Sequence, residues 1–182
     1  MQSALKLFAT RGYEATTTRE IAAGAGCAEG LIHRYFNGKA GLLTTLIDHH
    51  FSTEVADLGR ELQPGRDLPT EFIQLVLWEV ERFWGTQDLL KVVITRAFID
   101  SVVADAMKRG GISIRSKAIL ERLKRYPSAA TLAKDELETL AQSVGILGFV
   151  FGFMRPLVLG EERTHAKRMA MAFARMLVRG VA

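Results

Sequence analysis

The stretch from Thr16 to Lys39, TTTREIAAGAGCAEGLIHRYFNGK, constrains the fold of this chain more than any other segment. It reads as two short helices joined by a tight turn. Thr17 is the expected N-cap of the first helix, because Glu20 three residues later completes a capping box. Gly26 can adopt the positive φ that a sharp turn requires. The pattern fits a helix-turn-helix that binds DNA, but it also fits an ordinary pair of helices with a solvated outer face.

Apolar residues at helical spacing indicate which side of each short helix faces inward. They are Ile21, Ala22 and Ala25 on the first helix, and Ala28, Ile32 and Phe36 on the second. This arrangement directs the other side of the second helix toward solvent. The outward residues are then Glu29, Gly30, His33 and Arg34. A helix this short and polar can enter the major groove of DNA.

The residues on either side of this stretch favour the DNA-binding interpretation. From about Ala4 to Leu46 the sequence resembles the DNA-binding domain of the tetracycline-repressor (TetR) family of transcriptional regulators. The matching pieces, in fixed order, are LFATRGYEATT, REIAAGAG and EGLIHRYFNGK. The resemblance implies an all-α protein. We expect a three-helix helix-turn-helix DNA-binding domain over residues 1–47, followed by a helical effector-binding and dimerisation domain over residues 48–182.

The resemblance also implies a function. We expect a ligand-responsive, sequence-specific regulator, with repression as the expected mode, that a small molecule releases from its operator. Its partners would be a double-stranded inverted-repeat operator, a small-molecule effector of unknown identity and a second copy in a homodimer, without a membrane. A helical small-molecule-binding module that has lost DNA binding is the main alternative, and an enzyme is a more distant one.

Particular side chains of the motif are expected to contact DNA. Lys39 lies at the family's lysine position, so it and the Tyr35 hydroxyl are expected to contact phosphates. Arg34 suits guanine, because its fork matches the O6 and N7 acceptors. Glu29 is ambiguous, since it can accept from cytosine or favour the helix N-terminus. His33 departs from the family, where an aromatic residue is usual at this position. The full expected set is Thr17, Thr18, Arg19, Ala28, Glu29, Gly30, Leu31, His33, Arg34, Tyr35 and Lys39.

Composition agrees with a globular regulator and adds one constraint. The net charge of +4 and a pI near 9.4 favour a polyanionic partner only mildly. Residues 1–50 hold five basic and four acidic side chains, so DNA affinity must come from a few placed donors, helix N-termini and dimerisation. The lone Cys27 and the absence of a visible signal peptide lead us to expect a cytoplasmic protein. The longest apolar run, Val144 to Met154, is too short to span a bilayer.

Beyond the motif the chain reads as helical almost throughout, without strand alternation or internal repeats. The expected helices cover about 40–62, 69–84, 88–109, 113–126, 133–154 and 161–179. Their breaks fall at Pro64-Gly65, Gly110-Gly111, Pro127 and Pro156. A domain boundary near Asp48 would lie inside a long helix, which could carry movement from one domain to the other.

The last two helices are expected to form the dimer interface. Gly145, Gly148 and Gly152 share one helix face, which would let another backbone approach closely. The final helix carries an apolar stripe of Met169, Phe173, Met176 and Leu177. The alternative is a buried core helix beside an ordinary surface helix.

Candidate effector residues lie in the middle of the chain. Arg96 and Asp100 stand four residues apart among apolar neighbours, which suggests a pocket with polar anchors. An ion pair at a crowded helix contact is the plainer interpretation. Trp78 lies on the polar side of its helix and either lines a cleft or is simply exposed. If Arg96 binds the effector, its replacement should change the effector response and spare DNA binding.

Catalytic and metal sites are not expected. His50 and Glu54 share a helix face beside His49, but two such ligands without a third are usually surface residues. Cys27 falls in the turn of the motif, where packing is its expected role. We find no nucleophile elbow and no phosphate-binding loop. No cofactor is therefore expected.

Overall fold

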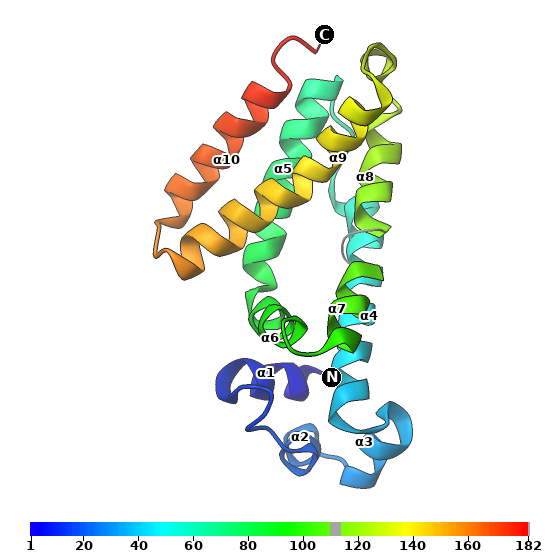
Figure 1. Ribbon diagram of the computed structural model, residues 1–182, viewed down its shortest axis with the longest axis vertical. Coiled ribbons are helices and arrows are strands. Elements are labelled where there is room, and N and C mark those ends of the chain that lie inside the picture. Colours follow the sequence, from blue (N-terminus) through cyan, green and yellow to red (C-terminus); the bar gives the residue numbers. More distant parts are fainter. Residues whose placement is uncertain (110–113, 182) are drawn as a thin grey trace. The chain divides into compact units, whose positions relative to one another are not determined.

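The computed structural model describes residues 1–109 and 114–181, and these residues form helices and loops without a strand (Figure 1). The all-α prediction is confirmed. The chain divides into two compact units, of which unit 1 contains Met1–Glu54 and Gln87–Ile112, and unit 2 contains Val55–Thr86 and Ser113–Ala182. The division falls inside a continuous helix, α4 (Gly38–Glu61). Residues 110–113, which include the predicted Gly110-Gly111 break, lie outside the described residues.

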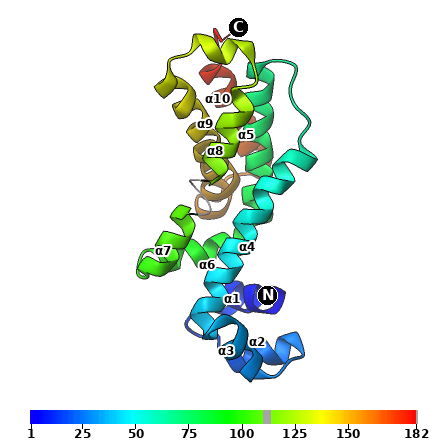
Figure 2. The same ribbon diagram turned by 90° about the vertical axis from the view of Figure 1, so that its right-hand side faces the viewer.

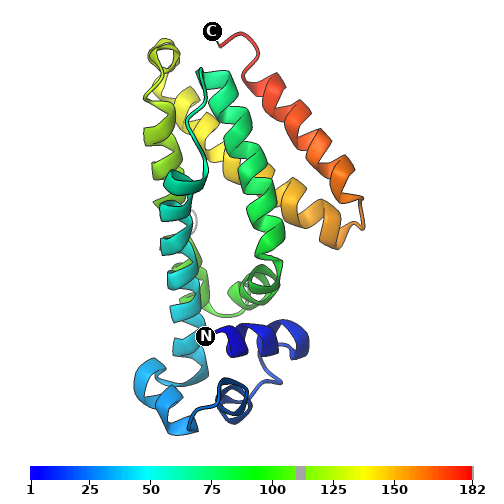
Figure 3. The same cartoon turned by 180° about the vertical axis from the view of Figure 1, so that it is seen from behind.

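Unit 1 gathers the first three helices around the start of α4. These are α1 (Gln2–Arg11), α2 (Thr18–Ala25) and α3 (Glu29–Phe36), and α6 (Gln87–Ala97) packs against α1 (Figure 3). Phe8, Leu43 and Ile47 are almost completely buried at the centre of this unit. Burial of large apolar side chains provides the main driving force for assembling such short helices.

The predicted single helix over residues 88–109 is wrong, because the chain breaks between α6 and α7 (Ser101–Met107). Asp100 has an extended backbone and caps α7, since its Oδ1 accepts from the N–H groups of Val102 at 3.0 Å and Val103 at 3.4 Å. An N-cap carboxylate satisfies donors that a helix start leaves unpaired. The sequence did not reveal this cap, because the apolar residues on either side of Asp100 keep helical spacing across the break.

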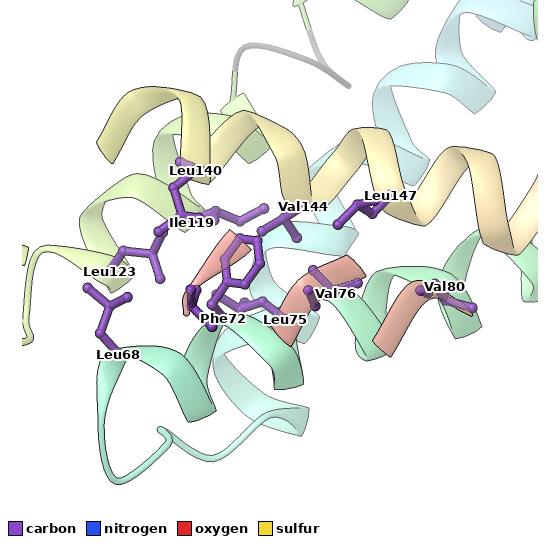
Figure 4. Packing of buried hydrophobic residues seen from close by; sticks show 14 of the residues in the cluster. Leu68, Phe72, Leu75, Val76, Val80, Ile119, Leu123, Leu140, Val144 and Leu147 are labelled. Atoms are coloured by element: carbon purple, nitrogen blue, oxygen red, sulfur yellow. The ribbon is translucent and has the colours of Figure 1, made fainter. Parts of the chain in front are cut away.

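Unit 2 is built around α5 (Leu68–Gly85). Four helical segments pack around α5: α8 (Arg115–Leu123), α9 (Lys134–Phe149), the π-helix η3 (Val150–Val158) and α10 (Arg163–Leu177) (Figure 2). A short 3-10 helix, η2 (Pro127–Thr131), precedes α9. Figure 4 shows how side chains of α5, α8 and α9 meet in one apolar core. Phe72, Leu75 and Val76 of α5 are completely buried there.

Gly148 of α9 and Gly152 of η3 pack inside unit 2, which contradicts the prediction that these two glycines form a dimer interface. A Cβ placed on Gly148 would lie 2.7 Å from Cβ of Glu79 and 3.0 Å from the ring of Phe83. A Cβ on Gly152 would lie 2.4 Å from the carbonyl oxygen of Val80. Both glycines therefore allow α5 of the same chain to approach closely. A Cβ on Gly145 would lie 3.8 Å from Arg115 Nη2, its one contact within 4 Å among the described residues.

The helix after α9 continues through Pro156, although the sequence predicted that this proline would end it. Pro156 lacks an N–H and would clash with the carbonyl four residues back in an α-helix. The wider π-helix bonds to the carbonyl five residues back, as Leu159 N does to Met154 O at 3.2 Å. The wider turn therefore accommodates the proline.

The combined helix Lys134–Val158 is long and apolar enough, by length and composition, to cross a membrane. The apolar run Val144 to Met154 was predicted to be too short, but the surrounding helical residues extend it. Half of the most apolar window is buried inside the structure. Core helices of globular proteins pass the same test, so this helix is weak support for a membrane role.

A buried polar cluster lies beside the end of α4 in unit 2. The Glu71 carboxylate accepts from Arg122 Nε, from Gly65 N at 2.6 Å and from the Tyr126 hydroxyl at 2.9 Å. The Arg122 guanidinium also donates to the carbonyl oxygens of Leu58 at 3.2 Å and Leu62 at 2.7 Å. Burial and the hydrogen bond to Glu71 raise the pKa of Tyr126 from 10.0 to about 12.

Candidate DNA-binding surface

The first helix of the motif begins as its sequence predicts. Thr17 Oγ1 accepts from Glu20 N at 3.2 Å, and Glu20 Oε2 accepts from Thr17 N at 2.9 Å, which completes the capping box. Hydrogen bonds from the Thr17 N–H and hydroxyl to the carboxylate, together with the neighbouring Arg11 guanidinium, lower the pKa of Glu20. The start of α2 is therefore fixed by its own residues.

The turn between α2 and α3 has the predicted left-handed glycine, but three small residues that were predicted to face inward are exposed. Gly26 adopts the left-handed conformation, with φ 65° and ψ 34°. Cys27 is exposed, so the prediction that it packs inside is wrong. Ala25 and Ala28 are also exposed, although both were expected to face inward. The left-handed turn leaves these small residues outside, while Ile21, Ala22 and Ile32 are buried.

The outer side of α3 is open to solvent. Leu31 is 41% exposed, and a Cβ on Gly30 would meet no atom of the described residues within 4 Å. His33 and Arg34 are exposed beside them. No packing within the described part of the chain explains a leucine and a glycine at these positions. Contact with an external surface would explain both.

Tyr35 is more exposed than its sequence suggested. The ring was expected to pack against the helix pair, but the residue is 68% exposed. The Arg34 guanidinium lies 5.7 Å from its ring centroid, within the range of a cation–π contact. The two side chains therefore form one cationic and aromatic edge on α3.

One hydrogen bond across the motif was not visible in the sequence. Thr18 Oγ1, at the start of α2, donates to Glu29 Oε1 on α3 at 2.5 Å. This contact joins residues eleven positions apart and orients the Glu29 carboxylate. The sequence shows both residue types but not the crossing of the two helices that brings them together.

Lys39 has partners that were not predicted. Its ammonium donates to the carbonyl oxygens of Tyr13 at 2.8 Å and Glu14 at 3.3 Å, on the loop between α1 and α2. The ammonium also lies 3.9 Å from Oε2 of the Glu14 carboxylate. The phosphate contact of Lys39 stays a prediction, and the lysine also holds the loop.

Loss of the α2 cap should be measurable. Replacing Thr17 with alanine is expected to lower the free energy of unfolding by about 1 kcal/mol, because the Glu20 N–H loses its acceptor. Urea unfolding followed by circular dichroism measures this change. Thr17→Ser keeps the accepting oxygen and is the matched control. An alanine variant that unfolds at the wild-type urea concentration would contradict the assigned cap.

The three predicted effector residues are not brought together within either unit. Arg96 and Asp100 pair at 3.1 Å in unit 1, where Arg96 also bonds to Glu14 of the α1–α2 loop. Trp78 belongs to unit 2, where it donates to Glu61 at 3.3 Å and stacks with Arg82 at 4.7 Å. The plainer interpretation, a structural ion pair, therefore describes the contacts of Arg96 better than a ligand anchor.

The apolar stripe of α10 is largely uncovered. Ala166, Ala170 and Ala174 form the buried side of this helix. Phe173, Met176 and Leu177 are exposed, Met176 by 68%, and Met169 is partly buried. An open groove of about 410 Å³ lies next to Leu177, between the start of α9 and the end of α10, and Asp135 and Glu136 contribute to its wall.

The metal hypothesis gains no support from the structure. Among the described residues, no three potential ligand side chains gather to hold an ion. The side chain of Glu54, which was considered together with His50, lies outside the described residues.

Comparison with known proteins relates both the sequence and the fold to transcriptional regulators. Residues 1–46 match the family described as bacterial regulatory proteins, tetR family. The chain is 35% identical over 99 residues to the HTH-type transcriptional repressor KstR of Rhodococcus jostii, covering 54% of this chain and 45% of that protein. It is 32% identical over 92 residues to the uncharacterized HTH-type transcriptional regulator YvkB of Bacillus subtilis, covering 50% and 47%. The chain thus spans about half the length of these relatives.

Solved structures share the whole fold. A TetR-family transcriptional regulator from Rhodococcus sp. superposes with a TM-score of 0.77 at 13% identity, covering 97% of this chain and 95% of that one. FadR from Bacillus subtilis, solved with stearoyl-CoA, superposes with a TM-score of 0.75 at 14% identity, covering 100% and 97%. At these identities the comparison establishes the arrangement of helices.

Proposed function

Because this chain belongs to the TetR family of bacterial regulatory proteins, we propose that it is a ligand-responsive, sequence-specific DNA-binding regulator that represses transcription. The observation that supports this most is the outer side of α3, where Gly30, Leu31 and Arg34 are exposed on a helix held by a capped α2. Its relatives are transcriptional regulators, so an enzymatic role has no support from them. A protein that binds the bacterial chromosome would work in the cytoplasm.

On this surface, the start of α2 would contact phosphates and the outer side of α3 would contact bases. Thr17, Thr18 and Arg19 begin α2, where the helix dipole favours a phosphate. Lys39 and Tyr35 are the other phosphate contacts we propose. His33, Arg34 and Leu31 face outward on α3 and would contact base edges and a thymine methyl. Gly30 would let the backbone approach the groove, between Ala28 and Glu29 on one side and Leu31 on the other.

Base discrimination by Arg34 can be tested directly. Replacing Arg34 with alanine is expected to relax preference at one symmetric pair of positions, because each arginine–guanine pair contributes about 1–3 kcal/mol of discrimination. Selection of sites from random double-stranded DNA, followed by sequencing, measures that preference for each variant. Arg66→Ala, which removes an arginine whose side chain is 85% exposed in unit 2, is the control. Unchanged preference in the Arg34 variant would remove this residue from base contact.

The uncovered stripe of α10 supports a homodimer. Met169, Phe173, Met176 and Leu177 form an apolar surface that a second copy could bury. The interface we propose retains these residues and excludes Gly148 and Gly152, which pack against α5. Two recognition helices fixed by one interface would contact two half-sites, so the operator would be an inverted repeat.

A small-molecule effector would act on the dimer. FadR from Bacillus subtilis, which has a similar fold, was solved with stearoyl-CoA, and this supports a search for the effector among acyl-CoA thioesters. For the effector to lower DNA affinity, it must bind better to an arrangement whose recognition helices do not match the operator spacing. The contacts within each unit do not support Trp78, Arg96 and Asp100 as one effector site.

A further inference from the structure

The loop between α1 and α2 is held from two other helices of unit 1. Lys39, from the start of α4, bonds to the carbonyl oxygens of Tyr13 and Glu14, and it pairs with the Glu14 carboxylate at 3.9 Å. Arg96, from the end of α6, bonds to the Glu14 carboxylate through Nη1. Each of these cations also lies over the Tyr13 ring, with Lys39 Nζ 4.4 Å and Arg96 Cζ 4.7 Å from its centroid. We call Tyr13, Glu14, Lys39 and Arg96 the loop clasp.

The position of Lys39 indicates that the clasp matters to the fold of this unit. A cation in the first turn of a helix is disfavoured by the helix dipole. Lys39 is the second residue of α4, and its side chain is only 23% exposed. The two loop carbonyls and the aromatic ring compensate for this placement. The lysine thereby ties the loop to α4.

Arg96 is itself fixed by the break between α6 and α7. Its Nε donates to Asp100 Oδ2 at 3.1 Å, while Asp100 Oδ1 caps α7. One carboxylate therefore orients both the guanidinium and the first turn of α7. Because the guanidinium bonds to Asp100 and to Glu14, a shift of the α6–α7 junction would be passed to the loop.

The loop determines where α2 begins. Thr16 is buried, and its hydroxyl donates to Gly12 O at 2.8 Å and lies 3.3 Å from Leu7 O. The next residue is Thr17, the cap of α2, and Thr18 then holds Glu29 on α3. A displacement at Glu14 would therefore move the start of α2 and the outer side of α3 together.

We propose that Arg96 is a positioning residue for DNA binding, which acts from α6 through the loop clasp to hold α2 and α3 in the arrangement that fits the operator. This inference rests on the proposed DNA-binding function. It differs from the sequence-based expectation, in which replacing Arg96 would spare DNA binding. The clasp would also make the α6–α7 junction a place where a change in unit 1 alters operator affinity.

Operator affinity of folded protein tests this role. Arg96→Ala is expected to weaken operator binding about tenfold, or about 1.4 kcal/mol, because the loop that sets the start of α2 loses its contacts with α6. Binding is measured by fluorescence anisotropy on a site selected with the wild-type protein, well below the melting temperature and at known folded concentration. The dependence of log affinity on log salt should keep its slope, because no phosphate contact is lost. Lys91→Ala, on the exposed side of the same helix, should bind like wild type.

A double-mutant cycle separates positioning through the loop from other effects. Glu14→Gln should weaken binding less than Arg96→Ala. The double variant should lose clearly less affinity than the sum of the two single losses, since only the 3.9 Å pair of Glu14 with Lys39 is left to lose once Arg96 is gone. Fully additive losses would overturn the proposed route through Glu14. Wild-type affinity in folded Arg96→Ala would reduce Arg96 to a structural residue. A salt slope lower by about 1 would instead make it a direct phosphate contact.

A measurement that needs no DNA tests the loop clasp separately from the proposed DNA binding. If the wild-type protein selects no DNA site, DNA binding fails, but the clasp can still be tested by amide hydrogen exchange. The Thr16 N–H, which bonds to Tyr13 O at 3.3 Å, should lose protection in Arg96→Ala and keep it in Lys91→Ala. Equal protection in the two variants would overturn the clasp itself.

Discussion

Replacing Arg122 with alanine is expected to lower the free energy of unfolding by about 3–5 kcal/mol, because the buried Glu71 carboxylate would lose its only cation among the ion pairs of the described residues. Glu71 is completely buried and Arg122 is 6% exposed. The same substitution removes the donors to the carbonyl oxygens of Leu58 and Leu62, at the end of α4. Urea unfolding at neutral pH measures the change.

Two further variants show whether the unpaired charge causes this loss. Arg125→Ala removes an exposed arginine close by in the sequence and should leave stability within about 0.5 kcal/mol of wild type. Glu71→Gln combined with Arg122→Ala should recover part of the lost stability, because no unpaired carboxylate remains. A double variant less stable than Arg122→Ala would show that the lost hydrogen bonds, and not the charge, dominate.

Replacing Gly152 with alanine is expected to lower the free energy of unfolding by about 3 kcal/mol, through overpacking. The added Cβ would lie 2.4 Å from the carbonyl oxygen of Val80 and 2.9 Å from Cβ of Phe83. Neither is the flexible end of a side chain, so η3 and α5 must move apart. Thermal or urea unfolding of the purified variant measures the effect.

The matched control for this substitution lies in the preceding helix α9. Gly145→Ala places its Cβ 3.8 Å from Arg115 Nη2 and also gains helix propensity, so it should be neutral or slightly stabilising. If Gly152 instead served a dimer interface, its alanine variant would keep the stability of the subunit and change only the association state. That outcome would contradict the packing described for unit 2.

Local features of the motif could be predicted from sequence because they depend on neighbouring residues. The capping box needs only Thr17 and Glu20 at the right spacing, and the positive φ at Gly26 follows from glycine's freedom in a turn. The exposed side of α3 follows from the burial of Ile32. These features position the candidate site.

The predictions that proved wrong concern residues whose contacts lie far away in the sequence. The glycines of α9 and η3 are consistent with close helix packing, but the sequence does not say whether the partner helix is α5 or a second subunit. Arg96 shows the right spacing to pair with Asp100, yet its contact with Glu14 spans 82 positions. Lys39 likewise meets the α1–α2 loop only after α4 folds against it. Spacing along one helix cannot reveal such partners.

Selection of binding sites from random double-stranded DNA with the wild-type protein tests the central claim most directly. The account predicts enrichment of one inverted repeat, with half-sites one helical turn or a multiple of it apart, and weaker binding to a single half-site than to the full repeat. Failure to enrich any sequence, or equal affinity for one half-site and for the repeat, would contradict a dimeric sequence-specific regulator.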